Sequence, residues 1–295
     1  MDERDWLADQ FEEKRGHLRG VAYRMLGSLS DADDAVQESW IRLSRNGAEG
    51  IENLGGWLTT VVAHVCLDML RSRHAKREEP LETPAGTEPP PQQHAKSDPE
   101  SEALLADSVG LALLVVLDRL DPAERLAFVL HDMFDLPFDE IAGIVGRSEA
   151  AARQLASRAR RRVRGADLST ADTIPGQRRV VDAFISALRA GDVPSLVNLL
   201  DPEFSVRADR FAAPAGVPSG IEGAEAWAKM AVQTARAARF ARLALVDGSV
   251  GLVIAPKGRL TRVLRFTIAG ERIAALEVIG DPERLQQLDL AVLEG

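Results

Sequence analysis

The stretch Pro137–Arg164, PFDEIAGIVGRSEAAARQLASRARRRVR, decides the fold of the middle of this 295-residue chain. It begins with a short apolar segment that has acidic residues in its first turn. Gly146 then allows a tight turn, and Ser148 belongs to the residue types that cap helix N-termini. A longer segment follows, with small and apolar residues at helical spacing. A short helix, a glycine turn and a longer helix predict a helix-turn-helix, whose second helix enters the major groove of DNA.

The second helix of this motif carries concentrated positive charge. Its inward stripe consists of Ala152, Leu155, Ala156, Ala159 and Val163. Gln154, Arg158 and Arg161 recur at i, i+4 and i+7 and therefore share a different face. The segment from Ser148 onward holds six arginines and one acid, Glu149, in a chain whose formal net charge is −9. Positive charge gathered against the overall sign predicts a local binding site for nucleic acid.

A second basic helix is predicted over residues 58–77, which end in RSRHAKR. Its inward residues are Leu58, Val61, Val62, Val65 and Met69. His64, Asp68 and Arg71 recur at i, i+4 and i+7 on another side of this helix. Two separated basic helices predict two contacts with one DNA.

Residues 1–77 are predicted to be helical throughout. Within DADDAVQESWIRLSR, residues 31–45, the apolar residues that form one buried face are Ala32, Val36, Trp40 and Leu43. Four acidic and amide residues stand largely off that face: Asp33, Asp34, Gln37 and Glu38. This helix therefore presents an acidic surface beside a hydrophobic stripe.

Two turn-rich stretches divide the chain into domains. Residues 78–100 contain six prolines and almost no apolar side chains, so this segment is predicted to be a linker. A second linker is predicted at 165–176, GADLSTADTIPG, where the composition shifts. The predicted domains are residues 1–77, 101–164 and 177–295.

The last of these segments has a different character. Helices are expected at 177–190, 193–200 and 222–238. A short strand, FSVRAD, is expected at 204–209. The apolar alternation that follows is broken by the hairpin signals Asp247-Gly248, Gly258 and Ala269-Gly270. Helices followed by antiparallel strands predict an α+β domain with helices on one sheet face. The predicted fold class is therefore multidomain, with two all-α domains and one α+β domain.

Composition excludes several classes of protein. The one cysteine, Cys66, rules out an internal disulfide and a cysteine-rich metal cluster, and we expect it to be a small core residue. The histidines show no metal-ligand spacing, so we expect neither a metal nor a cofactor. No run of about 18 apolar residues and no signal-peptide pattern occurs. We therefore expect no membrane span and a cytoplasmic location.

Three segments together resemble regions 2 and 4 of the extracytoplasmic-function sigma factors, which are group 4 of the sigma-70 family. They are DADDAVQESWIRLSR, GGWLTTVVAHVCLDMLRSRHAKRE and LDPAERLAFVLHDMFDLPFDEIAGIVGRSEAAARQLASRARRRV. The match covers residues 1–164 almost continuously, and the chain from 177 onward is similar to a SnoaL-like domain, a cone-shaped α+β fold. One subgroup of these sigma factors carries that domain in fusion. The resemblance implies a sigma factor that binds core RNA polymerase and directs promoter-specific initiation, tuned by the fused domain.

The resemblance also implies which residues meet the polymerase. Those that would dock on the coiled coil of the β′ subunit are Asp33, Asp34, Gln37 and Glu38. Acidic and amide groups can accept charge-assisted hydrogen bonds from arginines of a partner. Region 4 would contact the β flap.

The same resemblance implies contacts with promoter DNA. Near the minus-ten element these are His64, Asp68, Arg71 and Arg73. The preceding loop, Asn46 to Gly56, would capture a flipped base, with Asn53 as its polar contact. In the recognition helix, which Ser148 starts, the candidates for base edges are Glu149, Arg153, Gln154 and Arg158. The candidates for phosphates are Arg147, Arg161 and Arg162.

The predicted linker suits two promoter contacts. As polyproline II, its 23 residues reach about 70 Å at ~3.1 Å per residue. Two elements roughly 25 base pairs apart are separated by ~85 Å at ~3.4 Å per step. The widths of the two domains supply the remainder.

In the fused domain, the subgroup carries an Asn-Pro-Asp-Lys-Leu segment near the C-terminus. This chain has Asp281, Pro282, Glu283, Arg284 and Leu285, and we expect this segment to be regulatory. Where the subgroup has a glycine-rich stretch after the first strand, this chain reads ADRFAAPAG. Whether the domain inhibits or assists, and whether it binds a small ligand, stay open at this point.

Two other functions are compatible with parts of the pattern. A stand-alone helix-turn-helix regulator with a ligand-sensing SnoaL-like domain would bind duplex DNA without polymerase. A cyclase or isomerase would need acid–base residues, but no histidine, cysteine or tyrosine occurs after His131. Asp209 and Asp247 are the candidate carboxylates, and Asp247 lies in a predicted turn. We therefore expect no enzymatic activity.

Overall fold

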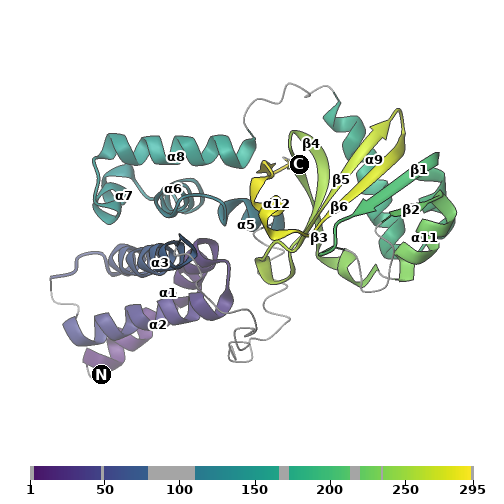
Figure 1. Ribbon diagram of the computed structural model, residues 1–295. Coiled ribbons are helices and arrows are strands. Elements are labelled where there is room, and N and C mark those ends of the chain that lie inside the picture. Colours follow the sequence, from purple (N-terminus) through teal and green to yellow (C-terminus); the bar gives the residue numbers. More distant parts are fainter. Residues whose placement is uncertain are drawn as a thin grey trace, which may run out of the picture. The chain divides into compact units, whose positions relative to one another are not determined.

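The computed structural model describes residues 3–47, 50–78, 110–165, 173–212, 220–233 and 235–293 (Figure 1). The chain forms two compact units. The first contains the described residues up to Glu78 together with Leu117–Arg160, and the second contains Gly110–Val116 and the described residues from Arg161 onward. Most of the predicted linkers at 78–100 and 165–176 lies outside the described residues.

Three helices build the N-terminal part of the first unit: α1 (Glu3–Leu26), α2 (Leu29–Asn46) and α3 (Leu54–Glu78). Gly27 ends α1 with a φ of 70°, a conformation that favours glycine. The Ser28 side chain then caps α2 by accepting a hydrogen bond from the Asp31 backbone N–H. The buried apolar residues include Leu18, Val21, Met25, Ala32, Val36, Leu43, Leu58 and Val62. The all-helical prediction for this part of the chain is confirmed.

The helix-turn-helix prediction is also confirmed. Asp121 caps α6 (Pro122–Phe128), which continues into the π-helical segment η1 (Val129–Met133). Then α7 (Phe138–Val145) leads through Gly146, which is left-handed with a φ of 71°, into α8 (Glu149–Arg164). The Ser148 hydroxyl accepts a hydrogen bond from the Ala151 backbone N–H at 3.3 Å, as expected of an N-cap.

The second unit is built on a sheet of seven strands. They are β1 (Leu200–Ala208), β2 (Gly220–Glu222), β3 (Ala241–Val246), β4 (Ser249–Ile254), β5 (Arg262–Ala269), β6 (Arg272–Ile279) and β7 (Leu290–Ala291). Their order is β2-β1-β6-β5-β4-β3-β7. The two hairpins β3–β4 and β5–β6 turn at the glycine-containing positions that the sequence predicted.

The antiparallel meander predicted for the strands after residue 240 is confirmed, because β3, β4, β5 and β6 pair antiparallel in chain order. The parallel pairing of β1 with β6 was not predicted, because apolar alternation does not encode which strands pair. The predicted helix at 222–238 is divided into α11 (Ala224–Gln233) and the 3₁₀ segment η2 (Ala235–Phe240). Strand β7 was not predicted, since two residues are too few to show a period.

Helices cover one face of the sheet. Figure 1 shows α9 (Ile174–Ala190) and α11 beside the strands, and α10 (Val193–Leu199) packs with them. The core on this face includes an aromatic cluster in which Phe184 stacks on Trp227 at 5.7 Å between ring centroids. Phe204 and Phe266 complete the cluster. The remaining elements of this unit are α5 (Leu111–Leu117), η3 (Pro256–Gly258) and α12 (Pro282–Gln287).

Candidate nucleic-acid interface

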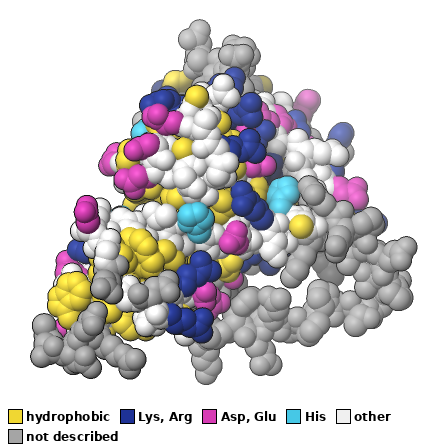
Figure 2. All heavy atoms as spheres, turned by 90° about the vertical axis from the view of Figure 1, so that its left-hand side faces the viewer, with side chains coloured by type: hydrophobic (Ala, Val, Ile, Leu, Met, Phe, Trp, Pro, Cys, Tyr) yellow, Lys and Arg dark blue, Asp and Glu magenta, His cyan; other side chains and the backbone are white. Residues whose placement is uncertain are grey.

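The recognition helix α8 separates apolar and cationic side chains as predicted. Its inward residues Ala152, Leu155, Ala156, Ala159 and Val163 are buried. The exposed candidates on its other faces are Arg153, Gln154, Arg158, Arg161 and Arg162. Figure 2 shows a column of Lys and Arg side chains down the middle of the face drawn there. The helix is therefore anchored by one stripe and offers its arginines to solvent.

Two arginines of α8 are held by neighbours within the first unit. Arg153 pairs with Glu149 one turn earlier, and its guanidinium lies 5.5 Å from the centre of the Phe138 ring. Arg160 pairs with Asp132 at 2.6 Å. In the part of the chain that the structure describes, Arg158 and Arg161 form no ion pair. These two guanidiniums are therefore the ones most available to an anionic partner.

The candidates on α3 occupy different environments. His64 donates a hydrogen bond from Nδ1 to the Thr60 carbonyl at 2.9 Å, which leaves Nε2 as an acceptor. Asp68 and Arg71 are exposed. Arg73 is paired with Asp31 of α2 at 2.7 Å, so this arginine must leave its partner before it can contact a phosphate. His64, Asp68 and Arg71 are thus accessible to a binding partner, whereas Arg73 is held in an ion pair within the protein.

Asn53 has a structural role of its own. Its Oδ1 accepts a hydrogen bond from the Gly56 backbone N–H at 3.0 Å, and α3 begins at the next residue, Leu54. This is the geometry of a helix N-cap. The side chain is exposed, and its Nδ2 remains as a donor.

The acidic candidates on α2 fall into two groups. Arg19 of α1 holds Asp33 through two hydrogen bonds of 2.7 and 3.1 Å, and Arg42 holds Glu38 at 3.0 Å. Asp34 and Gln37 are exposed, and neither forms a hydrogen bond or ion pair through its side chain within the described residues. The open acceptors of this surface are therefore Asp34 and Gln37.

A buried arginine, which sequence analysis did not single out, joins the two helical parts of the first unit. Arg125 of α6 donates from Nε and Nη2 to the Arg24 carbonyl of α1, at 3.2 and 3.1 Å. Its Nη1 lies 3.4 Å from Asp118. Burial lowers the pKa of Arg125 to about 10, so the guanidinium stays charged at neutral pH. The sequence signal was one cation in an otherwise apolar helical stripe.

Phe134 adds aromatic contacts at the same place. The Arg24 guanidinium lies 5.2 Å from the centre of its ring, and His17 meets it edge-on at 5.2 Å between centroids. His17 is exposed on one side, and its partial burial, with a smaller effect of nearby Lys14, lowers its pKa. We call the group formed by Arg125, Arg24, Phe134 and His17 the interlock. It holds α6 and η1 against α1.

In the second unit, the end of α8 is bonded to the C-terminal segment. The Val292 backbone N–H donates to the Val163 carbonyl at 2.8 Å. The same segment supplies β7, which pairs with β3. Val163 is buried and lies in the last turn of α8. The last turn of α8 is thus bonded to the C-terminal segment within the second unit.

The predicted regulatory segment forms a capped helix. Asp281 accepts hydrogen bonds from the Glu283 and Arg284 backbone N–H groups, and Pro282 occupies the first turn of α12. Leu285 is buried, and Arg284 pairs with Glu277 of β6 at 2.6 Å.

Asp209, a candidate carboxylate for catalysis, anchors this segment to the end of β1. It accepts four backbone hydrogen bonds, from Phe211, Ala212, Gly280 and Asp281, at 2.8 to 3.1 Å. Burial acts to raise the pKa of Asp209, but the hydrogen bonds outweigh it and hold the pKa below its usual value. A carboxylate whose oxygens are occupied in this way is suited to fastening two loops and poorly suited to general base catalysis.

Cys66 is buried, and burial raises the pKa of its thiol to about 12, as expected of a core residue. Among the residues that the structure describes, no three His, Cys, Asp or Glu side chains are grouped to hold a metal ion. No helix in the described ranges is long and apolar enough to cross a membrane.

Comparisons with known proteins agree with this architecture. The family models for sigma-70 region 2 and sigma-70 region 4 match residues 11–76 and 110–163. The chain is 36% identical over 291 residues to the ECF RNA polymerase sigma factor SigJ of Mycobacterium tuberculosis, which covers 93% of this chain and 92% of that protein. It is 39% identical over 203 residues to a probable ECF sigma factor SigI of the same species, covering 68% and 69%. The crystal structure of that SigJ matches with a TM-score of 0.45 at 33% identity, covering 94% of this chain and 98% of that one.

Proposed function

Because this chain belongs to the extracytoplasmic-function sigma factors and so directs transcription initiation by RNA polymerase, we propose which of its surfaces carry out each step. Helix α2 binds core polymerase, α3 with the preceding loop binds the minus-ten element, and α8 binds the minus-thirty-five element. Residues 1–77, 101–164 and 177–295 are the working domains, joined by linkers at 78–100 and 165–176. The protein acts in the cytoplasm, where its polymerase is.

The acidic face of α2 supports the polymerase contact. Asp34 and Gln37 are open acceptors, and they lie between two carboxylates already paired with arginines, Asp33 and Glu38. Exposed ion pairs contribute little to stability, so an arginine of the polymerase β′ coiled coil can replace Arg19 or Arg42 at small cost. The surface is thus preformed for a partner that carries guanidinium groups.

The cationic face of α8 supports the duplex contact. Gln154, Arg158 and Arg161 share one face and are exposed, while the opposite stripe is buried. Gln154 and Arg158 read base edges together with Glu149 and Arg153, and Arg147, Arg161 and Arg162 bind phosphates. Region 4 also meets the polymerase β flap.

The exposed side of α3 supports the second DNA contact. His64 presents an acceptor nitrogen, and Asp68 and Arg71 are solvent-exposed along the same helix. Asn53 contacts the flipped base through its Nδ2 while its Oδ1 keeps the helix cap. Arg73 joins the DNA contact when its pair with Asp31 opens.

The interlock implies that the protein changes shape on assembly. In the first unit α6 lies against α1, so region 2 and region 4 are packed together. Two promoter elements roughly 25 base pairs apart are separated by ~85 Å, so domains that each bind one element must move apart. The Arg125 contacts therefore open when the protein binds polymerase and promoter.

The α+β domain modulates this process through its hold on α8. The bond from Val292 to Val163 restrains the last turn of the recognition helix, next to the phosphate-binding Arg161 and Arg162. The segment Asp281–Leu285 positions the chain that leads to this contact, because Asp209 fixes its first residue. The domain therefore restrains α8 until assembly.

Reconstituted transcription tests the assignment of surfaces. Core polymerase plus the full-length protein should give promoter-specific transcripts, detected by sequencing their 5′ ends, and Asp34→Lys should reduce them about tenfold, a loss of about 1.4 kcal/mol in binding. The matched control is Glu13→Lys, a charge reversal at an exposed position on α1, which should leave output unchanged.

Two outcomes would contradict the proposal. Transcription no higher than with core polymerase alone would remove the initiating role assigned to these surfaces. Tight duplex binding without polymerase, together with full activity of Asp34→Lys, would favour a stand-alone helix-turn-helix regulator.

A further inference from the structure

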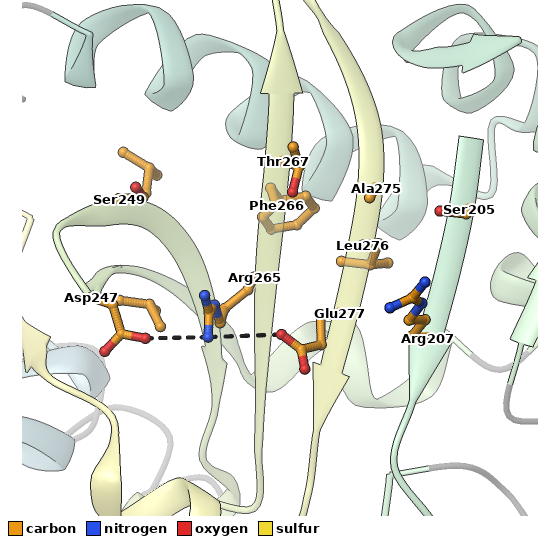
Figure 3. Close-up of a pocket in the computed structure, with 12 residues that line it drawn as sticks. Ser205, Arg207, Asp247, Ser249, Arg265, Phe266, Thr267, Ala275, Leu276 and Glu277 are labelled. Atoms are coloured by element: carbon orange, nitrogen blue, oxygen red, sulfur yellow. Dashed lines mark ion pairs between the residues drawn. The ribbon is translucent and has the colours of Figure 1, made fainter. Parts of the chain in front are cut away.

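A cavity of about 430 Å³ lies on the sheet face opposite the helix-covered core (Figure 3). Phe204 and Val206 of β1 point into that core, and by strand alternation Ser205 and Arg207 point to the other face. The walls come from β1, β5, β6 and the β3–β4 turn. The cavity thus opens on the other side of the sheet from the helices, although Phe266 of the aromatic cluster also contributes to its lining.

The side chains on this face form two rows across the strands. In the first row, Arg207 of β1 is in register with Glu277 of β6, which is in register with Arg265 of β5. Two residues along, Ser205 and Thr267 flank Ala275 in the same way. Figure 3 shows Asp247 extending the charged row and Ser249 extending the hydroxyl row. The short side chain of Ala275 leaves the floor of the cavity open.

Among the residues that the structure describes, one cation of the charged row has no ion-pair partner. Arg265 lies between Asp247 at 3.4 Å and Glu277 at 3.8 Å. Glu277 also pairs with Arg284 at 2.6 Å, so both carboxylates of the row are engaged. Arg207 forms no ion pair with any residue that the structure describes. The site therefore has one guanidinium ready for a carboxylate.

We propose that this cavity binds a small organic carboxylate that carries a second polar group. Arg207 binds the carboxylate in a bidentate manner, and the hydroxyls of Ser205 and Thr267 bind the second group about 7 Å away, the distance of two residues along a strand. The volume is in the range of small-molecule sites. Asp247 and Glu277 disfavour polyanions such as nucleic acid.

The cavity is connected to the recognition helix by a short chain of contacts within the second unit. The Asp247 carboxylate accepts a hydrogen bond from the Asp289 N–H at 2.9 Å, and the Asp247 N–H donates to the Asp289 carbonyl at 2.8 Å. Three residues later, Val292 donates to Val163 of α8. A ligand in the cavity therefore lies beside Asp247, which is hydrogen-bonded to the segment that holds α8.

Binding is tested on the full-length protein with 4-hydroxybenzoate as the probe, by saturation-transfer NMR. Arg207→Met should weaken binding at least about tenfold, and Ala275→Phe should abolish it by filling the floor. The matched control is Arg272→Met, an exposed arginine on β6 that does not line the cavity. The uncharged 4-hydroxybenzamide should bind at least about tenfold more weakly than the acid.

Several results would overturn the proposal. One is that the probe does not bind, and another is that Arg207→Met binds the probe as tightly as the wild type. A third is that inorganic phosphate binds as tightly as the probe, which would show unspecific attraction of anions. Because Arg207 is exposed, its variant keeps the test valid even if Ala275→Phe fails to fold. Saturating probe should also change hydrogen exchange at the Asp289 and Val292 amides; binding with unchanged exchange would overturn the connection to α8. None of these readouts depends on polymerase.

Discussion

The carbonyl oxygen of Arg24 accepts two hydrogen bonds from the buried guanidinium of Arg125. Arg24 lies in the last turn of α1, where carbonyl groups lack helical partners and the helix dipole favours a cation. The contact joins region 2 to region 4 across 101 residues of chain. One side chain therefore both completes a helix end and holds the protein in its packed form.

Replacing Arg125 should separate stability from polymerase binding. Arg125→Met keeps the volume but removes the charged hydrogen bonds, so urea unfolding should show a loss of about 2 kcal/mol. Binding to core polymerase should stay as tight as in the wild type or become tighter, because the interlock opens more readily. The exposed Arg15→Met variant should change neither quantity. A fall in polymerase affinity that follows the fall in stability would show that the contact is only structural.

Acidification should weaken the interlock through His17. Its pKa is lowered in the folded protein by burial and by Lys14, so the unfolded chain binds the proton more readily. Neutral His17 therefore favours the folded protein above its unfolded pKa of about 6.5. This stabilisation is lost as the pH falls through the lower pKa that His17 has in the folded protein. The ring faces Phe134 and the Thr59 hydroxyl, at 3.5 Å.

Unfolding midpoints measured between pH 7.5 and 5.5 test this dependence. On acidification the unfolding midpoint should fall less in His17→Gln than in the wild type. Lys14→Met should likewise make the fall in the midpoint smaller. Identical pH profiles for the wild type and His17→Gln would show that His17 does not contribute to the pH dependence of stability.

Asp209 should be needed for stability and dispensable for any chemistry. Asp209→Ala removes the acceptor of four backbone N–H groups, and we expect a loss of about 2–4 kcal/mol. Hydrogen exchange at Gly280 and Asp281 should accelerate, and Asp209→Asn should be intermediate because its oxygen still accepts. Asp182→Ala, at an exposed ion pair, is the control. Normal protection of both amides in Asp209→Ala would refute the anchoring role.

The elements that the sequence predicted well are those with local signals. The inward stripe of α8 is buried residue for residue, and Gly146 and Ser148 make the turn and the cap at their predicted places. Helical spacing, capping residues and turn glycines act within a few residues, so they are visible in one chain.

The long-range contacts had no such signal. Two of the four backbone N–H groups that bond Asp209 lie 71 and 72 residues away, and any residue but proline could provide them. The contact of Arg125 with the Arg24 carbonyl and the parallel pairing of β1 with β6 also use backbone groups far apart in the chain, so no residue type marks them. For this reason a structural carboxylate was indistinguishable from a candidate catalytic one before the fold was known.

Two arginines of α8 should affect DNA binding differently. Arg161→Ala removes a phosphate contact, so it should weaken all duplexes alike and lower the salt slope, log K against log salt, by about 0.9. Arg158→Ala removes a base contact and should cost about 1–3 kcal/mol on the preferred sequence only. Fluorescence anisotropy over a salt series distinguishes the two effects. Equal losses on preferred and unrelated duplexes for Arg158→Ala would place that residue on the backbone.

The bond between Val292 and Val163 should restrain the recognition helix. Val292→Pro removes the N–H donor, and Val292→Ala is the matched control because it keeps that donor while shortening the side chain. In the full-length protein, the proline variant should bind minus-thirty-five duplex about threefold or more tightly, a gain of roughly 0.7 kcal/mol, because the last turn of α8 is released. Trypsin cleavage near Arg164 should accelerate in the same variant, since the released turn opens locally. If both variants bind duplex equally, the contact does not restrain α8, and modulation by the α+β domain must act elsewhere in the chain.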